Sequence, residues 1–207
     1  MSRLAALTHG VVLAFGLIVA LGPQNVFVFQ QGATQPRYWR ALPTVLTASL
    51  ADTLLVSASV LGVSVAVLRY GWLQRALFGV GAVFLLYVGW TVYRAPTLSV
   101  EGGEALSTRR QVGFTLSVSL LNPHAILDTV GVIGTSALGY AGDARWTFAG
   151  AVIGVSWLWF AGLAATGRLL GRSESTAANA VLRRLDTVSA VVIWAVAVYM
   201  AVRFVSL

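Results

Sequence analysis

Two aspartates lie in stretches of the sequence that carry no other formal charge. Asp52 is the single charge in residues 41–68, and Asp128 is the single charge in residues 112–142. His124 precedes Asp128 by four residues, so on a helix the imidazole and the carboxylate share one face. A carboxylate binds cations and an imidazole titrates near neutral pH, which favours a pathway for cations or protons. The alternative is a buried hydrogen bond that only holds helices together.

Two prolines interrupt long apolar stretches of the sequence. Pro23 falls within residues 4–36 and Pro123 within residues 112–142. Proline removes a backbone donor and clashes with the preceding turn, so we expect a helix break at each. Broken helices at membrane depth can line a cavity and bind substrate or ions, whereas a simple kink is the alternative. The breaks are expected at Gly22, Pro23, Asn122 and Pro123. Polar side chains at them favour the binding site, and these are Gln24, Asn25, Asn122 and His124.

The composition is that of an integral membrane protein. Of the 207 residues, 57% are hydrophobic and 10% are charged, and the mean hydropathy is +0.81. A soluble domain has about 25% charged residues. The apolar stretches are continuous and do not alternate with polar residues, which favours helices over a barrel. We therefore expect an all-α, multi-pass protein whose residues 1–207 form one transmembrane domain in the lipid bilayer.

Polar stretches divide the sequence into six apolar ones. Leu-Gly-Pro at residues 21–23 and Leu-Asn-Pro at residues 121–123 each fall in the first helix of a three-helix half. An odd number of helices per half inverts the second half. We expect two inverted three-helix repeats, about 1–95 and about 112–207, joined by a polar loop at residues 94–111, with helices one and four broken. The six expected spans are residues 4–36, 41–68, 76–93, 112–142, 144–166 and 187–202.

Several classes of function fit the sequence poorly. The chain has no cysteine, which excludes disulfides, thiolate metal sites and dithiol redox chemistry. Two histidines and scattered aspartates make a poor metal site, so we expect neither a metal nor a cofactor. We expect no enzyme, because no nucleophile accompanies His124 and Asp128. The net charge of +7 comes from arginines scattered between apolar stretches, which indicates helix flanks rather than nucleic-acid binding. Gly150 and Gly154 are expected to let the fifth span approach a neighbour closely.

The motifs around the two breaks resemble those of a known family. The sequence reads Leu-Gly-Pro-Gln-Asn-Val-Phe-Val at residues 21–28 and Leu-Asn-Pro-His-Ala-Ile-Leu-Asp-Thr at residues 121–129, with an aspartate at position 52. These stretches resemble the signatures of the LysE/ArgO basic amino-acid exporters of the LysE/RhtB superfamily. The Pro-Gln-Asn and Asn-Pro-His-x-x-x-Asp forms look like the branch that transports basic amino acids, and the resemblance extends over essentially the whole chain.

The resemblance implies export of L-lysine or L-arginine across the bacterial cytoplasmic (inner) membrane, coupled to the proton motive force. In this interpretation the half-helix amino ends hold the substrate carboxylate, while the aspartates face its cationic groups. An exporter of threonine or homoserine, or a membrane subunit without transport activity, stays open, and so does a homodimer. The expected substrate ligands are Asp128, Asp52, Asn122, His124, Gln24 and Asn25, and the expected proton-coupling groups are Asp128, Asp52 and His124.

The arginines predict the orientation in the membrane. In the six-span arrangement, nine of the fourteen basic residues fall on the side of the 94–111 loop and five on the other. The positive-inside rule places the nine in the cytoplasm and both termini outside. A reporter fused at Leu207 should therefore be exoplasmic, and one inserted into the 94–111 loop cytoplasmic. Cytoplasmic readings at both sites would contradict the even number of spans.

Overall fold

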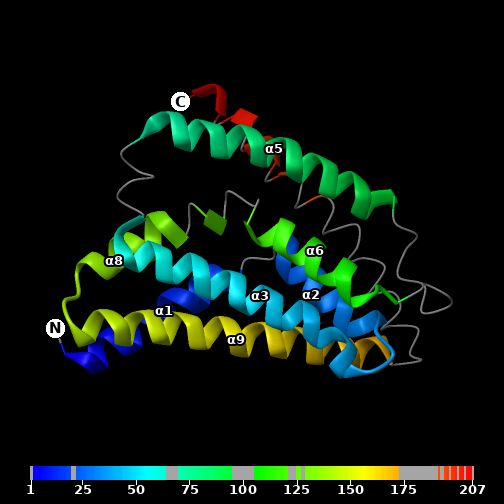
Figure 1. Ribbon diagram of the computed structural model, residues 1–207, viewed down its shortest axis with the longest axis horizontal. Helices are drawn as coiled ribbons and strands as arrows, with labels where there is room; N and C mark the ends of the chain where they lie inside the picture. The colour runs from blue at the N-terminus through cyan, green and yellow to red at the C-terminus, as the bar shows by residue number, and fades with distance from the viewer. Residues whose placement is uncertain are drawn as a thin grey trace.

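The computed structural model describes most of the chain, and every described element is a helix (Figure 1). The all-α prediction is confirmed for these residues. The helices are α1 (Arg3–Ile18), α2 (Pro23–Thr34), α3 (Tyr38–Ala58), η1 (Ser59–Val63), α5 (Gly71–Arg94), α6 (Thr108–Leu120), η2 (Thr129–Gly134), α8 (Thr135–Leu138) and α9 (Asp143–Gly171). The described residues are 2–19, 22–63, 70–94, 105–120, 125–126, 129–172, 191, 194–195, 197–199, 201–202 and 204–206.

Some of the described helices have the length and composition of membrane spans. Two described helices, Tyr38–Gly62 and Asp143–Gly171, are long and apolar enough to cross a membrane. The bent pair α1 and α2 makes a third if the two are counted as one span. The arrangement of six spans in two inverted repeats goes beyond the described residues and stays a prediction.

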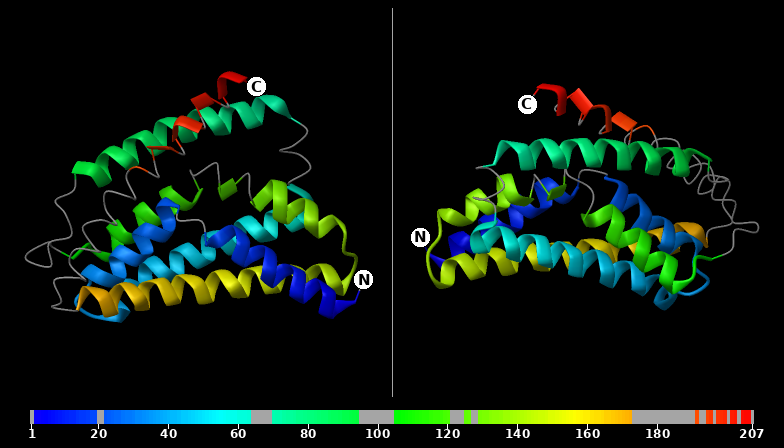
Figure 2. Two further views of the ribbon diagram at one scale, coloured as in Figure 1. Left: turned by 180° about the vertical axis from the view of Figure 1, so that it is seen from behind. Right: turned by 45° about the horizontal axis from the view of Figure 1, so that its top comes forward.

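Helix α9 is the element against which the first half of the chain packs. It contacts α1, α2 and α3 along its length, and α3 also contacts α6. The view from behind shows α1 and α2 lying along α9, while α5 lies farther away on the other side of α6, beside the end of the chain (Figure 2). The N-terminus and the described end of the chain at residues 204–206 lie toward the same end of the molecule (Figure 1).

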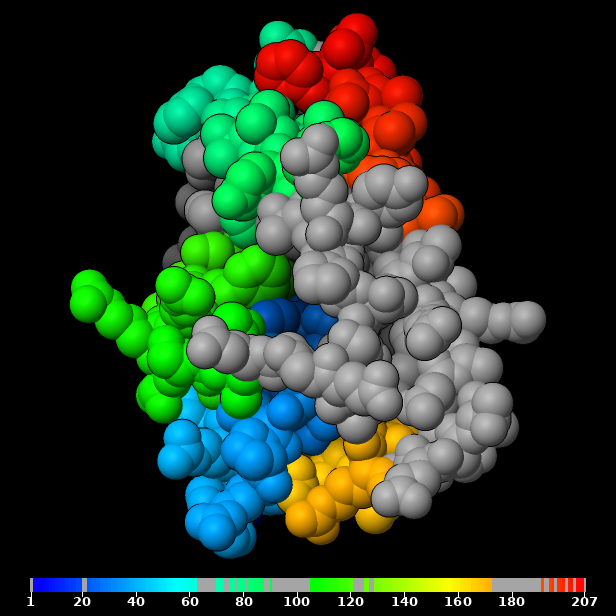
Figure 3. Space-filling view, turned by 90° about the vertical axis from the view of Figure 1, so that its right-hand side faces the viewer, coloured from blue at the N-terminus to red at the C-terminus, as the bar shows by residue number. Residues whose placement is uncertain are grey.

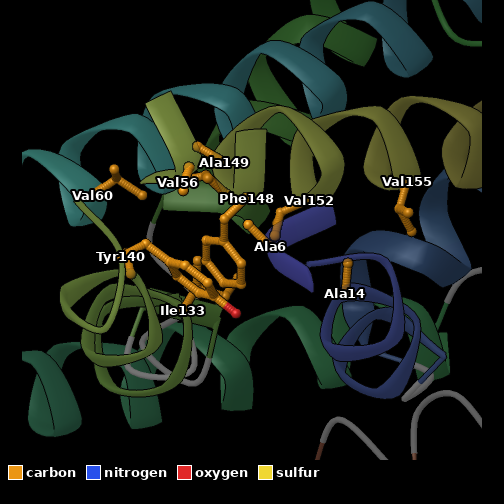
Figure 4. Close-up of a cluster of buried hydrophobic side chains, with 12 residues drawn as sticks. Ala6, Ala14, Val56, Val60, Ile133, Tyr140, Phe148, Ala149, Val152 and Val155 are labelled. Carbon is orange, nitrogen blue, oxygen red and sulfur yellow. The ribbon is translucent and has the colours of Figure 1, made fainter. Parts of the chain in front are cut away.

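The largest buried cluster joins α9 to α1, to the end of α3 with η1, and to η2 with α8. Phe148 on α9 is fully buried and stacks against Tyr140 at 5.4 Å between ring centroids. Val56, Val60 and Ile133 close the cluster from the other helices (Figure 4). Burying such side chains in close packing fixes α1 and α9 against each other over their shared length.

A second, polar cluster lies where α2, α3, α6 and α9 come together near their loops. The buried Gln111 amide accepts a hydrogen bond from Thr44 Oγ1 at 2.9 Å and donates to the carbonyls of Arg40 and Leu106 at 3.0 and 2.9 Å. Arg168 donates to the carbonyls of Gln35 and Pro36, both at 2.6 Å. Figure 3 views this end of the molecule, with α6 in green, the start of α3 in light blue and the end of α9 in orange. Arg168 thus satisfies carbonyls that follow the end of α2, and the Gln111 amide links the start of α6 to the first turn of α3.

The contact between α2 and α9 depends on glycine. A Cβ atom at Gly32 of α2 would overlap the carbonyl oxygen of Ala164. On α9, a Cβ atom at Gly167 would overlap the carbonyl oxygen of Phe29, and one at Gly171 would overlap that of Ala33. Gly167 and Gly171 have the spacing that allows close helix approach. The expectation for Gly150 and Gly154 was wrong in the described structure, because a Cβ atom at either would meet nothing within 4 Å.

The glycine contact predicts a steric effect on stability. Gly167→Ala should destabilise the folded protein by about 1–3 kcal/mol, because the new methyl group has no space against α2. Gly154→Ala is the matched control on the same helix, where the better helix propensity of alanine acts alone. The measurement is the melting temperature of each purified protein in detergent. Equal melting temperatures for the two variants would contradict the close contact.

Candidate functional site

The first apolar stretch is interrupted as the proline predicts. Helix α1 ends at Ile18, α2 begins at Pro23, and the two helices form an angle of 80°. Gly22 precedes α2 in an extended conformation, with φ −88° and ψ 170°. Proline is well suited to the first position of a helix, where its missing N–H would have had no intrahelical partner. The break at Gly22 and Pro23 therefore follows from local backbone chemistry.

Asn25 connects the two sides of this break. Its buried side chain donates from Nδ2 to the carbonyl oxygen of Ile18 at 2.7 Å. That carbonyl belongs to the last turn of α1, where helix geometry supplies no backbone partner. The Asn25 Oδ1 atom accepts a hydrogen bond from Trp159 Nε1 of α9 at 3.3 Å. Both ends of the Asn25 amide are thus engaged with protein, which assigns this residue a role in holding the break.

The Gln24 side chain beside the same break, unlike that of Asn25, has an unsatisfied donor in the described structure. Its Nε2 atom is buried and has no hydrogen-bond partner among the described residues. A buried unsatisfied donor costs about 1–3 kcal/mol. The adjacent backbone N–H groups of the first turn of α2 point toward the amino end of the helix, where its dipole is positive. The unpaired Gln24 amide donor and the positive helix end together suit a carboxylate ligand.

Asp52 lies halfway along the spanning helix that begins with α3. At about 1.5 Å per residue it is roughly 20 Å from Tyr38 and roughly 15 Å from Gly62. Ser156, near the middle of α9, donates a hydrogen bond from its Oγ to the Asp52 carboxylate. Trp157 donates from Nε1 to Thr53 Oγ1 at 3.0 Å. Neutral donors of α9 therefore meet α3 at the depth of its single carboxylate.

The described residues provide no cation for Asp52. The ion pair that they contain joins Arg3 to Asp143, both exposed, at the starts of α1 and α9. A carboxylate at mid-membrane depth costs about 2.5–3.5 kcal/mol on insertion scales. The half-buried Asp52 bears this cost with only a neutral hydroxyl as its hydrogen-bond partner in the described structure. Such an acid is suited to bind a mobile cation, either a proton or a positively charged ligand.

Helix α9 brings the break and Asp52 to nearly the same depth. Ser156 contacts Asp52 and Trp159 contacts Asn25, and these two α9 residues are about one helical turn apart. Helices α3 and α6 run in the same direction from the hydrogen bond between Thr44 and Gln111. Equal steps along both helices place Ser119 of α6 level with Asp52. The Ser119 hydroxyl is buried and without a partner among the described residues.

The predicted site residues around the second break are not among the described residues. Asn122, Pro123, His124 and Asp128 lie outside the described residues, so their roles stay predictions. Ser156 and Trp159 are site residues that the sequence analysis did not assign. A lone serine in an apolar stretch is a weak signal, because serines in membrane helices commonly bond to their own backbone.

Comparisons with known proteins agree on one family. The model of the LysE type translocator family matches residues 15–203. A Bacillus subtilis (strain 168) protein named "Putative amino-acid transporter YisU" is 48% identical over 198 residues, covering 95% of this chain and 89% of the relative. The arginine exporter ArgO of Pectobacterium carotovorum (strain PC1) is 32% identical over 202 residues, covering 95% and 97%. That of Salmonella typhi is 32% identical over 198 residues, covering 93% and 92%. No solved structure matches the chain.

The bond between Trp159 and Asn25 predicts how firmly the break is held. Trp159→Phe keeps an aromatic ring but removes the N–H donor, so local opening of the break should increase by about fivefold. The chain lacks cysteine and has space for a Cβ atom at Gly22, so Gly22→Cys provides a clean labelling site. The measurement is the rate of maleimide labelling at this cysteine. Trp146→Phe, an exposed tryptophan of the same helix, is the control, and equal rates in both variants would refute the assignment.

Proposed function

The chain belongs to the LysE family of translocators, and from this membership we propose that it exports a basic amino acid across the bacterial cytoplasmic membrane. The family and the relatives make it an amino-acid exporter of a membrane. The proposed substrates are L-arginine and L-lysine, and the proposed driving force is the proton motive force. The similarity to arginine exporters at 32% identity over nearly the whole chain supports the basic substrate.

The presence of two aspartates in apolar stretches, Asp52 and Asp128, carries the choice of a cationic substrate. Asp52 lies at mid-membrane depth with a neutral hydroxyl, and no cation, as its partner in the described part of the chain. An exporter of neutral amino acids has no need for a carboxylate beyond the one that balances the substrate ammonium. A basic amino acid carries two positive groups, which two membrane acids can meet. In the proposal these acids are Asp52 and Asp128.

The substrate carboxylate is bound at the first break. The amino end of α2 presents backbone N–H groups and a positive dipole, and the Gln24 Nε2 donor lacks a partner among the described residues. Asn25 keeps this helix end in place through Ile18 and Trp159. Asn122 and His124 are proposed to contribute from the second break. Substrate thus bridges donors on one side and acids on the other.

Release follows from competition for the acids. A proton that enters from the outer side and binds Asp52, Asp128 or His124 removes or opposes the negative charge that holds the substrate. The substrate then leaves outward, and return of the proton to the cytoplasm resets the site. Each substrate exit is in this way coupled to inward proton movement, as expected for a secondary transporter with its site at the midplane.

The proposal predicts the effect of removing either membrane charge. Asp128→Asn and Asp52→Asn should each reduce arginine efflux by about a hundredfold or more, because a substrate cation would enter a low-dielectric site unpaired. Asp143→Asn is the matched control, since this exposed carboxylate pairs with Arg3 and contributes little. The measurement is efflux of preloaded arginine, lysine and threonine from cells with equal protein levels.

Three results would contradict the proposal. Wild-type rates in both Asp52→Asn and Asp128→Asn would make the carboxylates structural. Export of threonine in preference to arginine and lysine by the unmodified protein would assign the chain to a neutral substrate. Absence of export for all three would favour a membrane subunit without this transport activity.

A further inference from the structure

We propose that Ser156 is a positioning residue that orients the Asp52 carboxylate toward the substrate cation. The proposal rests on the proposed function, because it assigns Ser156 a role in binding the exported amino acid. Ser156 is 3% exposed and comes from α9, whereas Asp52 belongs to α3. Ser156 acts through Asp52 and does not itself contact the substrate.

The hydrogen-bonding choices of Ser156 support this role. Its hydroxyl has one proton, and the structure gives that proton two acceptors, the Asp52 carboxylate and the Val152 carbonyl of its own helix at 3.3 Å. Serine in a helix is satisfied by such a backbone acceptor alone. Ser156 therefore does not need Asp52 for its own satisfaction. Asp52 depends on this bond more than Ser156 does, because Ser156 is its hydrogen-bond donor in the described structure.

The bond fixes one oxygen of the carboxylate and leaves the other available. Ser156 donates to Oδ2 of Asp52. A hydroxyl can also accept a hydrogen bond from a protonated acid, so the pair stays bonded whether Asp52 is charged or neutral. The carboxylate thus keeps one orientation through a change of charge. Binding of a cation needs this orientation in advance, since an aspartate that rotates freely loses entropy on each binding event.

The helix seam around Ser156 is held independently of it. Trp157 donates to Thr53 at 3.0 Å, one residue along each helix from the Ser156 and Asp52 pair. Close packing at Gly167 and Gly171 fixes α9 against α2. Removing the Ser156 hydroxyl should therefore leave α9 in place and change only the freedom of Asp52. A change in substrate affinity with unchanged folding is the signature that separates positioning from a structural role.

The test is a kinetic comparison in proteoliposomes loaded with radiolabelled arginine. Ser156→Ala should raise the KM for arginine efflux by about tenfold, the size expected for one hydrogen bond to a charged group. Its maximal rate should stay within about twofold of wild type. Ser156→Thr retains the hydroxyl and should restore the KM. Thr166→Ala removes a hydroxyl that bonds within α9, to Gly162 at 2.9 Å, and should leave the KM unchanged.

Melting temperatures in detergent, with and without arginine, provide the second readout. Ser156→Ala should melt like wild type without arginine and show a smaller stabilisation by arginine. An unchanged KM, a Ser156→Ala protein that does not fold, or a loss of maximal rate with unchanged KM would each overturn the positioning role. Failure of the unmodified protein to export arginine would instead refute the proposed function, so the two ideas fail separately.

Discussion

A carboxylate halfway through a membrane helix is the constraint around which the described structure is arranged. Asp52 is distant from both ends of its span, so it cannot reach the interface by extending its side chain. Its neighbours must stabilise it, and α9 does so with the Ser156 hydroxyl. A neutral donor makes the acid tolerable without neutralising it. The remaining negative charge is then available to a ligand that comes and goes.

The break in the first span places backbone groups that lack intrahelical partners and a positive helix end inside the membrane, where Asp52 places a negative charge. Ending α1 at Ile18 leaves carbonyls without intrahelical partners, and starting α2 at Pro23 turns the positive end of a helix toward the break. Asn25 satisfies one of the carbonyls, whereas the Gln24 Nε2 donor beside the amino end of α2 has no partner among the described residues. The break is therefore electropositive in character, and it lies within about one turn of α9 from the electronegative Asp52. A zwitterion with an added positive charge matches this separation of charges.

The sequence predicted the features that depend on single residues with strong local effects. Pro23 can only begin a helix in this setting, so the position of the break follows from the residue type alone. Asp52 stood out because membrane segments rarely contain charge, and the family followed from two motifs. Ser156 and Trp159 could not be predicted, because their roles arise only when α9 packs against α2 and α3. The two glycine pairs of α9 show the same limit, since identical spacing produced a tight contact at Gly167 and Gly171 and none at Gly150 and Gly154.

The glycine contacts also determine which parts of the transporter can move against each other. Helices α2 and α9 meet backbone to backbone at Gly32, Gly167 and Gly171, and no side chains there can slide or change rotamer to absorb a displacement. The two helices are therefore joined as one stiff unit, to which Asn25 is attached through Trp159. Other helix surfaces, such as that of α3 with α6, are instead separated by side chains. Gln111 lies on that boundary, where its amide accepts from Thr44 and donates to the Arg40 carbonyl, so polar side-chain bonds take the place there that backbone contact has between α2 and α9.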